Sequence, residues 1–169
     1  AEAVQGPEHP DLTIPAQTQP EKSFAFRSQL SPAVQLLEYA VLEDRLVIWV
    51  ITKDHFVSRV KTISMTELNQ LISHYLSLIA QPPSKTDQRW REPAQSLYNW
   101  LISPVADLLD REKQLCIIPD KALFRLPFGT LLAPETGHLL LESYLISYAS
   151  SANVFQALTV RANDKQALQ

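Results

Sequence analysis

Hydrophobic and polar positions divide this chain into an irregular beginning, a patterned middle and a short polar end. Residues 1–32 carry five of the twelve prolines and little hydrophobic periodicity. Proline fixes φ and lacks an N–H donor, so we expect residues 1–32 to form an extended arm or linker. The periodic pattern of residues 33–160 predicts one folded domain, and residues 161–169, which are mostly polar, predict a tail.

Three apolar runs, separated by short charged stretches, begin at Val34. The charged stretches Glu43–Arg45 and Lys53-Asp54 have the composition of turns, so the pattern predicts a three-stranded antiparallel meander. The run Leu46–Ile51 is apolar without alternation. Such a run is typical of a strand covered on both faces, and we expect it to be the central strand.

Helical spacing follows the meander. Ser64 has the position of an N-cap, and apolar residues recur every three or four positions from Leu68 to Ile79. A second helix is predicted from about Pro93 to Leu109, and Pro104 is expected to kink it or divide it in two. A last helix is expected from Ser150 or Ser151 through Leu158.

Two further strands are predicted between residues 114 and 148. The apolar run Leu115–Ile118 stops at Pro119-Asp120, and a later run, Tyr144–Tyr148, ends in small polar residues. The fold class is therefore α/β, with antiparallel N-terminal strands, two helices, and then the first strands of a mostly parallel sheet.

Composition excludes several classes of function. The net charge is −3 without a basic cluster, and no apolar stretch has the length of a membrane span, so neither nucleic acid nor membrane is expected as a partner. The single cysteine excludes an internal disulfide and a Cys-rich zinc site, and three glycines exclude a glycine-rich phosphate loop. We expect no metal or organic cofactor. With no signal peptide visible, we expect a cytoplasmic location.

Four motifs stand in an order that resembles the CHAT domain, the caspase-like family related to separase. The resemblance covers about residues 36–160. The motifs are the strands EYAVLEDRLVIWVIT, the helix LYNWLISP, the block IIPD followed by Leu123 and Leu126-Pro127-Phe128, and the block LLLESYLISYASS.

The resemblance implies a caspase-like fold and a cysteine peptidase that acts on an extended protein segment. Members of the family carry a His-Gly at one later strand end and a Cys at the next. None of the four histidines here precedes a glycine, so this chain resembles the N-terminal half of the domain, without catalytic residues of its own. The expected partners are the missing C-terminal half of the domain and a helical-repeat region upstream. If the chain is isolated, we also expect it to associate with copies of itself. A non-catalytic interaction or scaffold module of the same fold is the alternative.

Individual residues allow two interpretations each. Cys116 lies within an apolar run and is expected to be a small buried hydrophobe rather than a nucleophile. Asp120 and Arg125 follow a strand end, where they either shape a substrate wall or serve as a turn former and a solvated cation. Phe128 either packs in the core or lines a specificity pocket.

Overall fold

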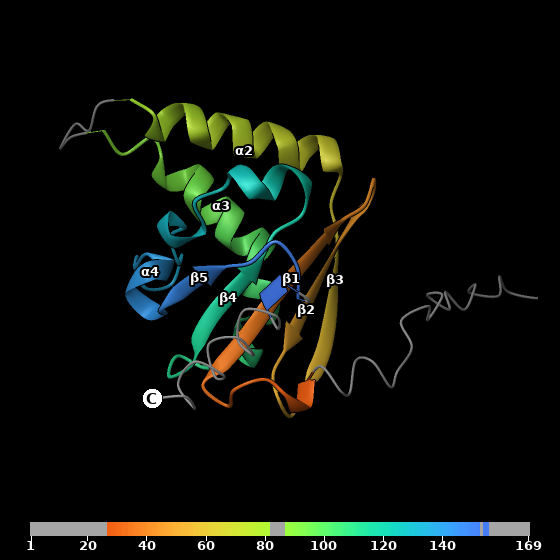
Figure 1. Ribbon diagram of the computed structural model, residues 1–169. Helices are drawn as coiled ribbons and strands as arrows, with labels where there is room; N and C mark the ends of the chain where they lie inside the picture. The colour runs from red at the N-terminus through yellow and green to blue at the C-terminus, as the bar shows by residue number, and fades with distance from the viewer. Residues whose placement is uncertain (1–26, 82–86, 153, 156–169) are drawn as a thin grey trace, which may run out of the picture.

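The computed structural model describes residues 27–81, 87–152 and 154–155, and a five-stranded mixed sheet forms its centre (Figure 1). The strand order is β3-β2-β1-β4-β5. The strands are β1 (Val34–Val41), β2 (Arg45–Ile51), β3 (Phe56–Thr62), β4 (Gln114–Ile118) and β5 (Ile146–Tyr148). Nearly all of the proline-rich arm, the polar tail and most of the last predicted helix lie outside the described residues.

The predicted antiparallel meander is confirmed. β1 pairs with β2 and β2 pairs with β3, both antiparallel. The first turn is closed by a hydrogen bond from the Leu42 N–H to the Arg45 carbonyl at 2.9 Å, and the second by one from Thr52 to His55 at 2.8 Å. β2 is the middle strand of the meander, but β1 holds the centre of the whole sheet, because its second edge pairs with β4.

The later strands are parallel, as the sequence predicted. β4 pairs with β1, placing Glu38 opposite Ile118, and β5 pairs with β4 on the far side. Two pairings are antiparallel and two are parallel, so the described sheet is mixed. An α/β fold with an antiparallel start and parallel later strands is therefore confirmed.

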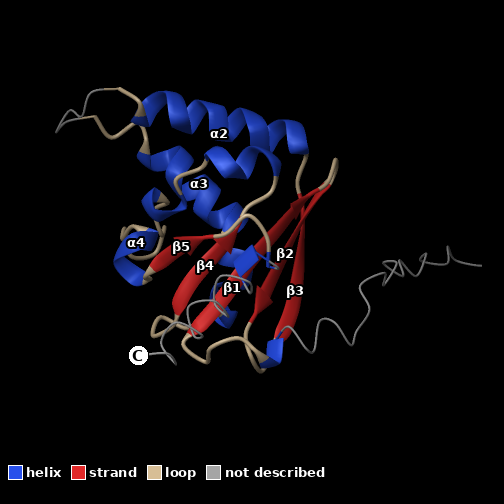
Figure 2. Cartoon of the chain, viewed as in Figure 1, coloured by secondary structure: helices blue, strands red, loops and turns tan. Residues whose placement is uncertain are grey.

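Helices cover one face of this sheet. The main ones are α2 (Met65–Ile79) and α3 (Arg91–Leu101), which lie side by side (Figure 2). The Ser64 hydroxyl accepts a hydrogen bond from the Thr66 N–H at 3.2 Å, which confirms Ser64 as the N-cap of α2. The shorter helices are η1 (Ser103–Leu108), η2 (Lys121–Arg125), η3 (Phe128–Thr130) and α4 (Leu140–Ser143).

The second predicted helix is divided, as Pro104 indicated. α3 ends at Leu101, and the chain continues as the 3₁₀ helix η1 with Pro104 in its first turn. Proline has no N–H to donate and its ring clashes with the carbonyl of the preceding turn, so the α-helix cannot pass through it. No helix of the described residues is both long and apolar enough to cross a bilayer.

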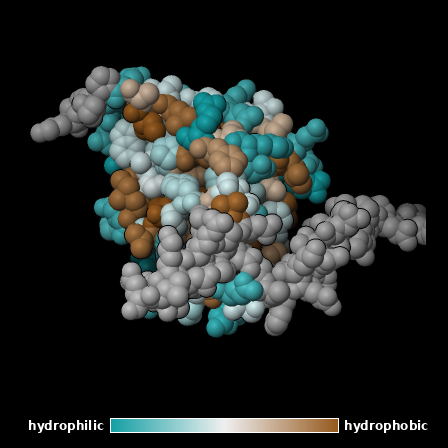
Figure 3. Space-filling model, viewed as in Figure 1, coloured by the Kyte–Doolittle hydropathy of each residue, from teal (hydrophilic) through white to brown (hydrophobic). Residues whose placement is uncertain are grey.

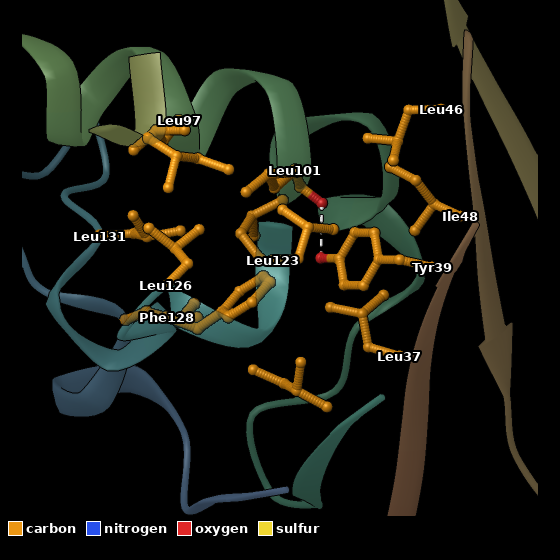
Figure 4. Close-up of a cluster of buried hydrophobic side chains, with 14 of the residues drawn as sticks. Leu37, Tyr39, Leu46, Ile48, Leu97, Leu101, Leu123, Leu126, Phe128 and Leu131 are labelled. Carbon is orange, nitrogen blue, oxygen red and sulfur yellow. Dashed lines mark hydrogen bonds between the residues drawn. The ribbon is translucent and has the colours of Figure 1, made fainter. Parts of the chain in front are cut away.

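The main core lies between the sheet and the helices (Figure 4). Every second residue of β1 and β2 points to this side, and α3 faces it with Leu97 and Leu101. The buried Tyr39 hydroxyl donates to the carbonyl of Leu101 at 2.9 Å, which ties β1 to the C-terminal end of α3. The loop after β4 completes the layer with Leu123, Leu126, Phe128 and Leu131.

The opposite face of the sheet carries a smaller buried cluster. Its members are Leu30, Leu36, Ile51, Cys116 and Ile118. Partly buried side chains from the segment after β5, Ala149, Ala152 and Phe155, pack against it. Neither α2 nor α3 contributes a buried residue to this cluster, so the two faces of the sheet are covered by different parts of the chain.

Candidate functional site

Three parallel strands end at one edge of the sheet. β1, β4 and β5 run in the same direction, so their carboxyl ends meet at this edge. The β4 strand is followed there by Pro119, Asp120 and the 3₁₀ helix η2, and β5 is followed by Ala149–Ser151 (Figure 1). Ligands of open α/β sheets bind beyond such carboxyl ends, so this edge is the candidate site.

The side chains of Asp120 and Lys121 both form hydrogen bonds with the backbone of Val41, the last residue of β1. One oxygen of the Asp120 carboxylate accepts a hydrogen bond from the Val41 N–H at 2.8 Å, and the Lys121 ammonium donates to the Val41 carbonyl at 2.6 Å. Ladder pairing between β1 and β4 ends at Glu38 opposite Ile118, because the residue that follows β4 is Pro119, which has no N–H to donate. The two side chains therefore replace the strand partner that Val41 lacks.

Lys121 has an unusual backbone conformation. Its φ is +49°, in the left-handed region that residues with a Cβ rarely adopt. This turn leads the chain from the end of β4 into η2, where the Leu123 N–H bonds to the Asp120 carbonyl at 3.0 Å. A non-glycine residue in that region costs about 1–2 kcal/mol, so the hydrogen bonds around Val41 hold a locally strained loop.

Arg125 and Phe124 point to solvent. Phe124 is 59% exposed and Arg125 is exposed, whereas Leu123 and Leu126 on either side are buried. Arg125 makes no ion pair with another residue that the structure describes. A 3₁₀ helix repeats every three residues, so the spacing of Leu123 and Leu126 puts the two residues between them outside. Sequence reasoning missed Phe124, which this spacing signals.

Phe128 belongs to the core. Its side chain is 0% exposed, and its ring lies 5.4 Å from the Tyr39 ring and 6.5 Å from the Tyr148 ring, measured between centroids. Of the two interpretations of Phe128, packing is the one that this position fits. The loop thus has an inner side that Phe128 anchors and an outer side that carries Phe124 and Arg125.

Cys116 lies inside β4, on the face opposite α2 and α3, and is 1% exposed. Burial raises the pKa of its thiol, and a hydrogen bond with Ser147 acts in the other direction with a smaller effect. Because the thiolate is the reactive form, both the burial and the raised pKa make Cys116 a poor nucleophile. Among the described residues, no group of three or more His, Cys, Asp and Glu side chains is arranged to hold a metal ion.

We expect Cys116 to react with an alkylating reagent on the order of 100-fold more slowly in the folded chain than in the chain unfolded by guanidinium. The reagent must wait for β4 to open before it reaches the thiol. Mass spectrometry of timed samples gives a clean measurement, since the chain has one cysteine. Equal rates in the folded and unfolded chains would mean that Cys116 is accessible and would contradict its place in the cluster.

Comparison with known families agrees with the motifs of this region. The family model for the CHAT domain matches residues 91–169, and no curated protein matches the chain. The matched segment runs from α3 through β5 and includes the loop that carries Asp120, Arg125 and Phe128. The meander and α2 precede it, so their likeness to the family stays a prediction. The resemblance of this chain to the CHAT domain is thereby confirmed over residues 91–169.

Proposed function

We propose that this chain is the N-terminal portion of a caspase-like cysteine peptidase domain, and that its loop from Asp120 to Phe128 forms one wall of the site for an extended protein substrate. The observation that carries the proposal is the place of this loop. It lies within the segment that matches the CHAT domain, at an edge where three parallel strands end together. The family match supports a peptidase-related domain at the coarse level.

In such a peptidase a cysteine thiolate attacks the scissile carbonyl, and a histidine takes and returns the proton. Cys116 is buried and hydrogen-bonded to Ser147, so we assign neither role to it. We infer that both catalytic residues come from sequence outside residues 1–169. The described chain contributes the first strands, the covering helices and the loop.

Within the loop, the residues have different roles in the proposal. Phe124 and Arg125 face solvent, so they are the side chains available to an extended peptide. Asp120 and Lys121 act as positioning residues, because they fix the loop to the end of β1 through Val41. Phe128 supports the wall from beneath, within the core.

The remainder of the domain is the first proposed partner. β5 is the last strand of the described sheet and pairs on one side only. Close to it, Leu145 is 73% exposed, Tyr148 54% and Leu141 53%. An open strand edge beside exposed apolar side chains favours the addition of another strand. Such an edge would also let isolated chains associate with one another.

A non-catalytic interaction or scaffold module is the second candidate. The observation in its favour is that the Asp120 carboxylate already bonds to the Val41 N–H, which gives Asp120 a structural task without any substrate. In that case the exposed Phe124 and Arg125 would contact a protein partner that is not cleaved.

Cleavage by the full-length protein tests the proposal. Arg125→Ala and Phe124→Ala should each lower kcat/KM toward extended peptide substrates on the order of tenfold, because a displaced substrate loses alignment with the nucleophile. The matched control is Lys53→Ala. Lys53 is exposed and lies in the turn after β2, at the end of the sheet away from the carboxyl ends of β1, β4 and β5. The 169-residue chain alone should show no cleavage above that of its Cys116→Ala variant.

Three outcomes would count against the proposal. Loop variants that fold and cleave like wild type would remove the loop from the site. Cleavage by the isolated chain that depends on Cys116 would place the nucleophile within residues 1–169. A folded full-length protein without any peptidase activity would favour the interaction module.

A further inference from the structure

Of the three buried residues of α2, one carries a hydroxyl group. The three are Leu68, Ile72 and Tyr75. The outer side of the helix is mainly polar, and hydrophilic side chains appear along the upper part of the molecule, where α2 lies (Figure 3). Tyr75 is 0% exposed, so its hydroxyl group needs a hydrogen-bond partner within the domain.

That partner is Thr130, the last residue of η3. The Tyr75 hydroxyl lies 2.6 Å from the Thr130 Oγ1, and the Thr130 carbonyl, at 3.2 Å, is a longer second acceptor. The Thr130 hydroxyl donates its one hydrogen to the Pro127 carbonyl at 2.8 Å, so in the bond with Tyr75 its oxygen accepts. Burial raises the pKa of Tyr75, with a smaller opposite effect from the bond with Thr130, so the phenol keeps the proton that it donates. The two bonds therefore run from Tyr75 through Thr130 to Pro127.

These bonds hold the C-terminal end of the loop that forms the proposed wall. The Pro127 carbonyl also accepts a hydrogen bond from the Thr130 N–H at 3.0 Å, so Thr130 binds it through both backbone and side chain. Pro127 follows Arg125 by two residues. The position of Pro127 thus limits where the exposed side chains of Phe124 and Arg125 can lie.

The other end of the loop is also attached close to α2. The Lys121 ammonium, which bonds to the Val41 carbonyl, lies 3.9 Å from the sulfur of Met65, the first residue of α2. In Figure 1 the loop lies beneath α2. Between its two attached ends the loop forms the short 3₁₀ helix η2, and such helices have poorer hydrogen-bond geometry than α-helices. The attachments therefore contribute more to the position of the loop than its own backbone hydrogen bonds do.

We propose that Tyr75 and Thr130 are positioning residues of the peptidase site: their hydrogen bonds hold Pro127, and through it Phe124 and Arg125, where an extended substrate passes. The inference rests on the proposed function and adds α2 to the same site. Neither Tyr75 nor Thr130 touches the substrate. Cleavage requires accurate alignment of the scissile bond, so a small shift of the wall slows the cleavage of substrates that reach it.

Tyr75→Phe tests this role, because it removes the hydroxyl group and keeps the ring. In the full-length protein, well below its unfolding temperature, kcat/KM toward extended peptides should fall about fivefold. A single-residue ester that is too short to reach the wall should be hydrolysed as by the wild type. A merely structural role would lower both activities in proportion to the loss of folded protein.

Variants of Thr130 and a second tyrosine complete the set. Thr130→Val lacks the hydroxyl and should behave like Tyr75→Phe, whereas Thr130→Ser keeps it and should behave like the wild type. The double variant of Tyr75→Phe and Thr130→Val should lose less than the product of the single losses, because both changes break one chain of bonds. Tyr39→Phe is the matched control, since it removes a buried hydroxyl that binds α3 through the Leu101 carbonyl. It should leave the ratio of peptide to ester cleavage unchanged.

Hydrogen exchange in the 169-residue chain tests the attachment of the loop without any substrate. Tyr75→Phe should speed exchange of the Thr130 amide, which bonds to the Pro127 carbonyl, on the order of tenfold, and Tyr39→Phe should not. A wild-type exchange rate in Tyr75→Phe would overturn the attachment. Faster exchange with unchanged cleavage of extended peptides would overturn the positioning role and leave the proposed function intact. A wild-type full-length protein that cleaves no peptide would refute the proposed function and the positioning role together.

Discussion

Replacing Phe128 by alanine is expected to lower the free energy of unfolding by about 3–5 kcal/mol. The ring is 0% exposed and lies between Tyr39 and Tyr148, so its removal leaves a cavity beneath the loop as well as lost apolar burial. The surrounding residues come from strands and helices and cannot collapse into the space without moving those elements. Guanidinium unfolding followed by circular dichroism gives the measurement.

Two substitutions serve as controls for Phe128. Phe128→Leu keeps much of the apolar volume and should cost less than half as much as the alanine variant. Phe124→Ala removes the same kind of ring from a side chain that is 59% exposed, and should change stability by about 0.5 kcal/mol or less. If Phe128→Ala lowered the free energy of unfolding by less than Phe124→Ala does, Phe128 would not be a core residue. A pocket-lining role for it would then regain support.

Replacing Asp120 by alanine is expected to lower the free energy of unfolding by about 1–3 kcal/mol. The substitution removes the acceptor for the Val41 N–H, which is bonded at 2.8 Å, and leaves this part-buried N–H without its partner. Hydrogen exchange measured by NMR should show faster exchange of the Val41 amide in this variant, because its protecting bond is lost. Asp120→Asn keeps an acceptor oxygen and should lose less stability than the alanine variant.

A matched control and a double variant sharpen this test. Asp54→Ala removes an exposed aspartate from the turn after β2 and should change stability by about 0.5 kcal/mol or less. Asp120→Ala combined with Lys121→Ala should cost less than the sum of the single changes, because both side chains hold Val41. If the Val41 amide exchanged at the same rate in Asp120→Ala as in the wild type, the Asp120 carboxylate would not hold the end of β1 through that hydrogen bond.

Short-range patterns in the sequence predicted much of the fold. The short charged stretches between the apolar runs marked both turns of the meander, Ser64 marked the start of α2, and Pro104 marked the end of α3. Each of these signals acts within a few residues of the structure that it determines. The order of the strands is different, because β1 takes the centre of the sheet through pairing with β4, about eighty residues later in the chain.

At the candidate site, too, neighbouring residues predicted where a side chain lies, but not which distant residue it binds. Pro119 placed Asp120 beyond the end of β4, as chain sense requires, and a turn aspartate that binds a backbone N–H was one of the two interpretations. The N–H that it binds belongs to Val41, 79 positions earlier, and no local pattern identifies that partner. The role of Lys121 was missed for the same reason, since neither its positive φ nor its bond to Val41 has a signature in neighbouring residues.

Position 121 has two requirements that no single amino acid meets in full. Glycine adopts a φ of +49° without steric strain. The hydrogen bond to the Val41 carbonyl, in contrast, needs a long side chain that ends in a donor such as the lysine ammonium. Lys121 satisfies the second requirement and accepts the strain of the first, and glycine would do the reverse. Any replacement there exchanges one defect for another, so this turn is a poor place to seek a more stable variant. Engineering of the domain should leave this residue as it is and begin elsewhere.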